Sequence, residues 1–348
     1  MLKRHFYYYL LKPYLPWRMR MAIRRIVARW KRQKYQAIWP INASAGRTPT
    51  GWNGWPEGKK FALVLTHDVE SPVGLARCRH LAELEMELGF RSSFNFIPEG
   101  TYIVPEELRF WLVANGFEVG VHDLKHDGKL YSNHTQFRHQ AQRINHYVNQ
   151  WGASGFRSGF MHHHQEWLHD LNVEYDASTF DTDPFEPQPD GVGTIFPFWV
   201  PSPHLNGLGQ KGTRFIVDID YKMQGRQSHF NSISPLTSRE GYVELPYTIP
   251  QDSTVYLLLQ EQTGEIWRNK VDWVAGRGGM ALINVHPDYL HVRSGSSDVA
   301  TLTAEQHYVD WLRYLAQSYK NDYWHVLPRQ MAGYVRDWNA RRTPDQHP

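Results

Sequence analysis

The chain has 348 residues, of which 41% are hydrophobic and 21% are charged, a balance that excludes a disordered protein and allows one barrel-sized domain or two smaller ones. A single cysteine excludes an internal disulfide framework and favours a reducing compartment, so we expect the protein in the cytoplasm or on the inner face of the membrane. Aromatic residues make up 14% of the chain, which fits dense packing or a surface on which flat rings stack against sugars.

The net charge of +3 hides an asymmetry between the first 34 residues and the rest of the chain. Residues 1–34 carry 11 of the 38 Lys and Arg residues and none of the 35 acidic residues. The other residues therefore hold 27 basic and 35 acidic side chains, a balance of −8. Because this body is mildly acidic, we expect no nucleic-acid partner for it.

Residues 1–42 form a basic, aromatic arm. The pattern of the first 34 residues is not typical of a secretory signal with a small-residue cleavage site, and we expect no membrane span, since no stretch reaches the roughly 20 apolar residues that one needs. Residues 17–34 have helical periodicity, with arginines around one apolar stripe. The stripe consists of Met19, Ile23, Ile26, Val27 and Trp30. Such a helix fits an anionic membrane surface, and the alternatives are packing against the acidic body or binding nucleic acid.

The rest of the chain is predicted to be a linker followed by one large domain. Residues 43–59 are rich in Gly, Pro, Ser, Thr and Asn, which indicates the linker, and residues 60–341 form the domain. Its strands are predicted at 61–66, 92–97, 117–122, 155–157, 173–177, 280–285 and 323–327. Its helices are predicted at 74–88, 105–114, 136–151, 165–171, 266–275, 304–319 and 331–338.

The alternation of apolar strands with helices predicts the fold class. It indicates an α/β protein with a parallel sheet, and about seven such units favour a TIM-like (β/α) barrel over an open sheet. The rhythm breaks at residues 184–250, a loop-rich insertion in which further strands are expected at 214–219 and 242–245. The arm at the N-terminus is then a helical extension of this barrel.

Four polar side chains follow the ends of two predicted strands. Asp68 and Glu70 come after the strand at 61–66, and His122 and His126 come at and after the end of the strand at 117–122. Because the carboxyl ends of parallel strands share one face of a barrel, we expect these side chains to meet. Two imidazoles and one carboxylate can bind a divalent metal, with the second carboxylate left beside it. This combination suits metal-assisted hydrolysis.

Four motifs occur in a characteristic order along the chain. They read Thr-His-Asp-Val-Glu at 66–70, Gly-Phe-Glu-Val-Gly-Val-His-Asp-Leu-Lys-His at 116–126, Gly-Phe-Arg-Ser-Gly-Phe at 155–160 and Asn-Val-His-Pro-Asp at 284–288. In this order they resemble the NodB-type polysaccharide deacetylases, which are the family 4 carbohydrate esterases. The Gly-x-Glu-x-Gly-x-His-x-x-x-His frame is the most specific match, and the resemblance runs from about residue 61 to residue 327. It implies a distorted (β/α) barrel.

The resemblance also implies roles for single residues. Asp68 would be the general base, and Arg157 would orient this carboxylate and keep it ionised. His122 and His126 would bind a divalent metal, for which zinc is expected. His286 would be the general acid, and its carboxylate partner stays open among three candidates. These are Asp176, Asp181 and Asp183.

The chain departs from the family pattern at two positions. The third metal ligand usually follows the general base directly, where Val69 stands here and cannot bind metal. Glu70, one residue further on, is therefore the expected third ligand. A proline usually stands two residues after the arginine, where this chain has Gly159, so a differently shaped loop is expected.

These features predict a metal-dependent hydrolase that removes an N-acyl group, in the first place N-acetyl, from a sugar in a glycan, a polysaccharide or a lipid-linked precursor. One alternative is a metal phosphohydrolase, because His-Asp dipeptides occur at 122–123 and 126–127. Phosphohydrolase sites of this kind usually lie in all-helical domains, and the clearly predicted strands before Thr66 and His122 argue against such a domain. A second alternative is a carbohydrate-binding protein that has lost catalysis, because the second aspartate and the proline of the family are missing.

Overall fold

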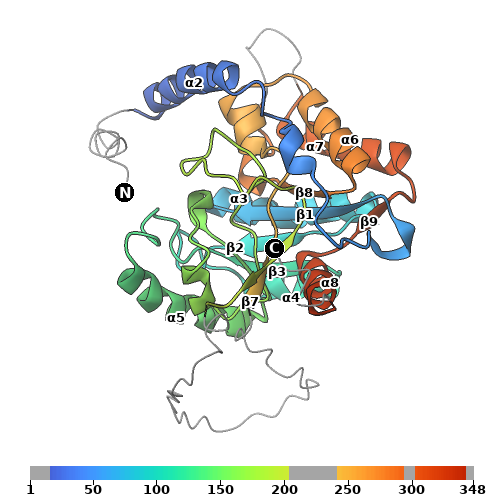
Figure 1. Cartoon of the computed structure of the whole chain (residues 1–348). Helices are drawn as coiled ribbons and strands as arrows, with labels where there is room; N and C mark the ends of the chain where they lie inside the picture. The colour runs from blue at the N-terminus through green and yellow to red at the C-terminus, as the bar shows by residue number, and fades with distance from the viewer. Residues whose placement is uncertain (1–15, 204–240, 294–301, 342–348) are drawn as a thin grey trace, which may run out of the picture.

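A computed structural model describes residues 16–203, 241–293 and 302–341, without the side chains of residues 17 and 18. Its centre is a curled, mostly parallel sheet that forms a half-barrel (Figure 1). The strands follow in the spatial order β6-β7-β5-β4-β3-β2-β1-β8, and β9 also pairs with β1. Their bounds are β1 (Phe61–Val69), β2 (Ser93–Phe96), β3 (Glu118–His122), β4 (Gly155–Arg157), β5 (Tyr175–Asp176), β6 (Phe198–Pro201), β7 (Gly241–Glu244), β8 (Met280–Asn284) and β9 (Tyr323–His325).

The half-barrel agrees with the predicted fold class, a distorted α/β barrel. Every residue of β1, β3 and β8 is buried, as is typical of parallel strands covered on both faces. All seven strands predicted for the barrel are present as β1 to β5, β8 and β9. Of the two strands predicted for the insertion, the one at 242–245 corresponds to β7, and the one at 214–219 lies outside the described residues.

Helices cover the outside of the sheet (Figure 1). Side-chain oxygens cap three of them: Ser71 caps α3, Asn133 caps α5, and Thr303 forms a capping box with Gln306 at α7. The helices are α2 (Trp17–Lys34), α3 (Pro72–Glu87), α4 (Glu106–Ala114), α5 (His134–Trp151), α6 (Glu265–Arg277), α7 (Ala304–Ser318) and α8 (Pro328–Ala340). Short 3₁₀ or π turns are η2 (Ala43–Gly46), η3 (Pro56–Gly58), η4 (Gly159–Met161), η5 (Trp167–Asp170), η6 (Ser253–Leu258) and η7 (Pro287–Tyr289).

Two local predictions differ from the structure. The helix predicted at 165–171 is only the 3₁₀ turn η5, in which the Trp167 ring stacks on the rings of His134 and His164. A segment of this length has little helical stability of its own, so these contacts decide its shape. The antiparallel strand β6 was not predicted, and it pairs with β7 at the edge of the sheet. Its last residue is Pro201, which cannot donate a ladder hydrogen bond and is tolerated because β6 is an edge strand.

The segment between the arm and the barrel packs against the body. Ala45 and Trp55 belong to the main hydrophobic core, and the Trp55 indole donates a hydrogen bond to the carbonyl of Gly278 at 2.8 Å. The division of the chain into arm, linker and barrel remains a prediction. Within the described residues, no helix is long and apolar enough to cross a membrane.

Strand register determines which polar residues meet at the carboxyl edge of the sheet. Asp68 in β1 lies opposite Asn95 in β2, and Thr66 lies opposite Asn284 in β8. In the same way His122, the last residue of β3, lies opposite Arg157, the last residue of β4. Because all these pairs are parallel, their side chains collect at one end of the half-barrel.

Candidate metal centre

Three side chains can hold a metal ion together. Ligand atoms of Glu70, His122 and His126 all lie within 4.8 Å of one another. The buried Nε2 atoms of both histidines form no hydrogen bond, although buried polar atoms normally have a partner. Two imidazole nitrogens and one carboxylate oxygen are a donor set that suits a divalent cation such as zinc. The residues present therefore fit the metal site that the sequence predicts.

The backbone and the neighbouring strand orient the two histidines. The His122 ring donates a hydrogen bond from Nδ1 to the Arg157 carbonyl at 3.0 Å, which leaves Nε2 available as a ligand. The His126 ring stacks on Phe160, with ring centroids 4.4 Å apart. Asp123 and His126 both have positive φ, of 56° and 54°, so the loop between the histidines follows an unusual path. These contacts hold both rings in place.

Strand geometry explains why Glu70, and not Val69, belongs to this centre. Successive side chains of a strand point to opposite faces, so Asp68 and Glu70 share one side and Val69 points to the other. Val69 is fully buried in the hydrophobic core. Glu70 Oε1 lies 3.4 Å from His126 Nε2, and Glu70 Oε2 accepts a hydrogen bond from Tyr289 at 2.8 Å.

The Glu70 carboxylate is ionised over the working pH range. Burial raises the pKa of Glu70, but the close contact with the His126 ring and the charges of His286 and His126 lower it by more, to about 2. Glu70 is thus an anionic ligand ready for a cation.

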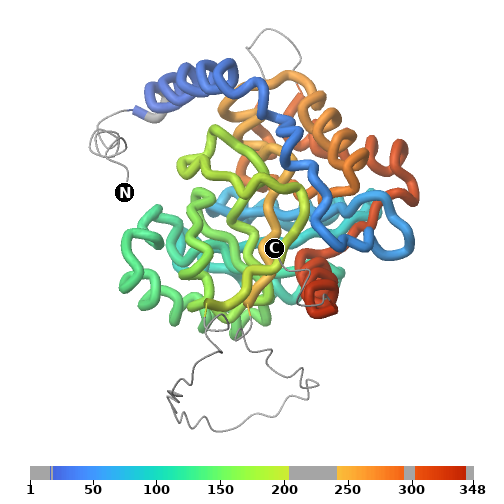
Figure 2. The backbone as a smooth tube through the Cα atoms, in the orientation of Figure 1, coloured from blue at the N-terminus to red at the C-terminus, as the bar shows by residue number. Residues whose placement is uncertain are grey.

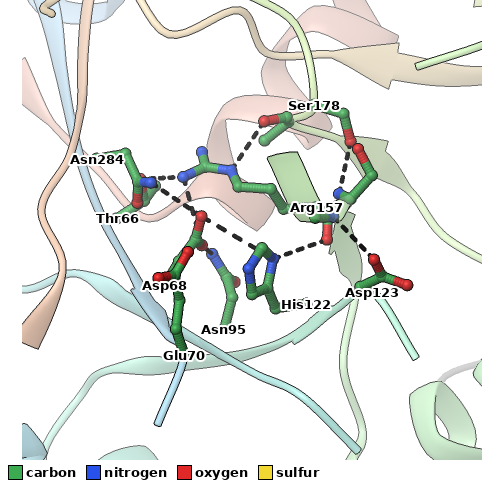
Figure 3. A network of polar contacts seen from close by, with 12 residues as sticks. Thr66, Asp68, Glu70, Asn95, His122, Asp123, Arg157, Ser178 and Asn284 are labelled. Atoms are coloured by element: carbon green, nitrogen blue, oxygen red, sulfur yellow. Dashed lines mark hydrogen bonds and ion pairs between the residues drawn. The ribbon is translucent and has the colours of Figure 1, made fainter. Parts of the chain in front are cut away.

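Asp68 lies beside these ligands and is held from several directions (Figure 3). Its Oδ1 accepts a hydrogen bond from Asn95 at 2.9 Å, and its Oδ2 accepts one from Asn284 at 2.8 Å. Burial raises the pKa of Asp68, but the charges of Arg157, His122 and His286 hold it well below its usual range. Asp68 is therefore ionised at neutral pH and held in a fixed direction.

Arg157 is a fully buried cation next to Asp68. Its Nη1 atom lies 3.5 Å from Asp68 Oδ1 and donates a hydrogen bond to Thr66 Oγ1 at 2.9 Å (Figure 3). Its Nε atom donates to the Ala177 carbonyl at 2.8 Å, so the guanidinium is anchored on the residue that directly follows β5. This placement fits the predicted function of keeping Asp68 oriented and ionised.

His286 pairs with Asp252, a residue that the sequence did not point to. The His286 Nδ1 and backbone N atoms donate to the two oxygens of Asp252 at 2.6 and 2.8 Å. Its Nε2 atom lies 3.8 Å from Glu70 Oε1. Burial lowers the pKa of His286, but the charge and hydrogen bond of Asp252 raise it by more, to about 10. The ring is thus a buried imidazolium that faces the candidate metal centre.

None of the three carboxylates expected as partners of His286 pairs with it. Asp176 accepts hydrogen bonds from Ser178, Asp181 forms an ion pair with Lys270 at 2.6 Å, and Asp183 accepts a hydrogen bond from Tyr247 at 2.9 Å. Asp252 follows Pro250-Gln251 and precedes a serine, which predicts only a helix cap, and it does cap η6. No sequence pattern indicates that the cap also contacts His286.

Steric crowding explains why residue 159 is glycine and not the expected proline. A Cβ atom at this position would lie 2.5 Å from Asp123 Oδ2 and 2.7 Å from His126 Cδ2. Gly159 also donates its backbone N–H to Asp123 Oδ2 at 3.3 Å. The loop after β4 therefore packs directly against the loop that carries the histidines, and only glycine fits between them without a shift.

Comparisons with known proteins were made for both the sequence and the fold. No protein-family model matches the sequence, and no curated protein matches it either. A candidate polysaccharide deacetylase from Mycobacterium smegmatis matches the fold with a TM-score of 0.56 and 16% identity, over 84% of this chain and 96% of that one.

Two further structural neighbours are more distant. The peptidoglycan deacetylase PdaC from Bacillus subtilis matches with a TM-score of 0.40 and 11% identity, over 82% of this chain and 95% of that one. A family 4 carbohydrate esterase from Streptomyces lividans matches with a TM-score of 0.37 and 9% identity, over 75% and 90% of the two chains. The resemblance expected from the motifs is thus confirmed for the fold: across most of its length the chain is similar to polysaccharide deacetylases.

Proposed function

We propose that the protein is a metal-dependent hydrolase that removes an N-acyl group, in the first place N-acetyl, from a sugar in a glycan, a polysaccharide or a lipid-linked precursor. One observation carries this proposal: the Glu70, His122 and His126 cluster lies beside both an ionised carboxylate, Asp68, and an imidazolium, His286. A base and an acid beside one cation site are the groups that amide hydrolysis needs.

Glu70, His122 and His126 would hold the cation, with zinc as the proposed ion. When bound, such a cation supplies Lewis-acid polarisation of the substrate carbonyl and lowers the pKa of water. The substrate amide would be placed within reach of Asp68 and His286, the two proton-transfer groups next to the ligands.

Asp68 would act as the general base towards the attacking water. Its hydrogen bonds with Asn95 and Asn284 leave further lone pairs on both oxygens, so it can accept one more proton donor. Arg157 limits its motion, which fixes the direction from which the water must approach.

His286 would act as the general acid towards the departing amine. Its Nδ1–H bond to Asp252 fixes the ring, so the proton on Nε2 points towards the ligand cluster. An amine leaving group must gain a proton to depart. The protonated His286 ring, with Nε2 3.8 Å from Glu70 Oε1, is close enough to the ligand cluster to supply it. Asp252 would then stabilise the positive charge whenever the ring carries it.

The proposal is tested by incubating the purified protein with N-acetylated sugars, nucleotide-sugars and lipid-linked saccharides, with and without a chelator. Mass spectrometry should detect the free amine and acetate, which should disappear with chelator and return with zinc. Asp68→Asn should abolish turnover with metal retained, while His139→Ala, an exposed histidine on α5, should behave as wild type.

Two results would overturn it. Phosphate-ester hydrolysis without deacetylation would favour the phosphohydrolase alternative. A protein without stoichiometric metal that still binds sugar after His122→Ala would favour a carbohydrate-binding protein that has lost catalysis.

A further inference from the structure

Helix α2 exposes a continuous apolar surface on one side, here called the apolar face of α2. It consists of Met19, Ile23, Ile26, Val27 and Trp30, which are 53%, 45%, 66%, 46% and 59% exposed. These residues recur at spacings of three and four, so they line one side of the helix. Isolated exposed apolar residues are common, but five on one helix face form a patch that indicates a partner.

The opposite side of α2 is firmly attached to the body. Met21 and Ala28 are buried, at 4% and 2% exposure. Arg25 donates two hydrogen bonds to the Leu257 carbonyl, at 3.2 and 3.3 Å, and Lys31 donates one to the Pro184 carbonyl at 2.6 Å. Figure 2 shows α2 running along the periphery of the molecule. The apolar face is therefore turned outward by the packing of the helix, and the described part of the body does not cover it.

The charges around the apolar face select the kind of partner. The helix contains eight Lys and Arg residues and no acidic residue. Arg24 and Arg29 are exposed, and the Lys34 ammonium lies 5.1 Å from the centre of the Trp30 ring. Two copies packed face to face would bring their cations together, which disfavours self-association. An anionic lipid surface complements both the apolar side chains and the cations.

We propose that α2 is a docking helix that lies flat on an anionic lipid bilayer. The apolar face enters the boundary between headgroups and acyl chains, Trp30 sits at the interface, and Arg24 and Arg29 contact lipid phosphates. With its eight cations, α2 cannot cross the hydrocarbon layer. This inference is independent of the catalytic proposal, because no residue of the metal centre takes part.

The docking helix lies next to the catalytic segment. It contacts η6, which begins directly after Asp252, and through Lys31 it holds Pro184. Only the width of the helix would therefore separate a bilayer bound to the apolar face of α2 from the segment that positions His286. Taken together with the proposed function, which this one step requires, the arrangement favours a lipid-linked sugar as substrate.

Sedimentation of the full-length protein with vesicles tests the docking helix. The vesicles are pure phosphatidylcholine, or phosphatidylcholine with about one-third phosphatidylglycerol to supply the anionic charge. We expect binding to the anionic vesicles and much weaker binding to the neutral ones. Raising the salt concentration should weaken binding further, because it screens the arginine contacts.

Three double variants make the test specific. Ile26→Ser with Trp30→Ser removes exposed apolar area and should weaken binding by at least about tenfold. Arg24→Gln with Arg29→Gln should weaken it by about thirtyfold, since each cation near an anionic surface contributes roughly fivefold. Ile103→Ser with Phe110→Ser is the matched control, because these side chains are 89% and 62% exposed elsewhere and should not affect binding.

Further results decide between this partner and others. Deleting residues 1–15 should leave most of the binding, since α2 provides the surface. The proposal is overturned by binding that survives Ile26→Ser with Trp30→Ser, or by binding that is lost only with residues 1–15. It is equally overturned if the wild type is a dimer that Ile26→Ser with Trp30→Ser dissociates, while neither protein binds vesicles. A second copy of the chain would then cover the apolar face of α2.

Discussion

Replacement of Asp252 by asparagine isolates the contribution of the carboxylate that pairs with His286. The change preserves size, but the Ser253 and His286 backbone N–H groups donate to different oxygens of Asp252, at 2.7 and 2.8 Å, so the single amide oxygen of asparagine can accept from only one of them. It removes the charge that raises the pKa of His286 to about 10. In the variant, burial lowers this pKa while the charges of Glu70 and Asp68 still raise it, so the ring should titrate well below the wild-type value of about 10, towards the ordinary value of 6.5.

The size of the effect follows from this change in pKa. At pH 8 a ring with a pKa of about 10 is almost fully protonated, whereas a ring with a pKa of 6.5 is about 3% protonated. The fraction of His286 in its acid form therefore falls about thirtyfold. The ring is also held less firmly without the carboxylate, which lowers kcat further. We expect kcat for deacetylation to fall by about 10² to 10⁴ at pH 8, with KM changed little.

The pH dependence of kcat is the decisive assay. In the wild type, kcat should begin to fall at a much higher pH than in Asp252→Asn. A bound cation would shift this alkaline pKa in the same direction for both proteins. Asp176→Asn, a buried carboxylate on the same rim that does not touch His286, should keep the wild-type profile. In a His286→Gln background, Asp252→Asn should have no further effect on kcat. Equal pH profiles for wild type and Asp252→Asn, with unchanged kcat, would refute the assignment of His286 as an acid charged by Asp252.

Three further predictions concern the metal centre and the core. Glu70→Gln should weaken zinc binding by about 100-fold or more in a metal titration while the fold is kept, and unchanged affinity would exclude Glu70 as a ligand. Gly159→Ala should destabilise the protein by about 1 to 3 kcal/mol, measured by urea unfolding, because its Cβ would press on His126. The same contact should weaken metal binding. A variant with unchanged stability and metal affinity would show that the loop can move. Glu118, whose pKa burial raises to about 7, is favoured in its protonated form in the folded state, so stability should fall as pH rises from about 4.5 to 7. Glu118→Gln should therefore gain roughly 2 to 3 kcal/mol over wild type in urea between pH 5 and pH 8, and parallel pH curves would contradict this.

The sequence was sufficient for features that depend on neighbours along the chain. Strand and helix periodicity predicted all seven barrel strands, because each buried strand is a short apolar run between turn residues. Asp68, Glu70, His122 and His126 could be placed together because each stands near or shortly after the end of such a strand. The apolar stripe of residues 17–34 was also evident, because helical spacing fixes which side chains share a side.

Other features depend on contacts between distant parts of the chain, and no local pattern encodes them. Asp252 meets His286 across 34 residues, and Asn284 meets Asp68 across 216, only because the half-barrel brings their strands and loops together. The direction of the apolar face of α2 was likewise undecided until Met21 and Ala28 were found buried against the body. Secondary structure and the metal-ligand candidates were thus determined by the sequence, whereas the partners that set charge and direction were decided by strand register and packing, because these join residues far apart along the chain.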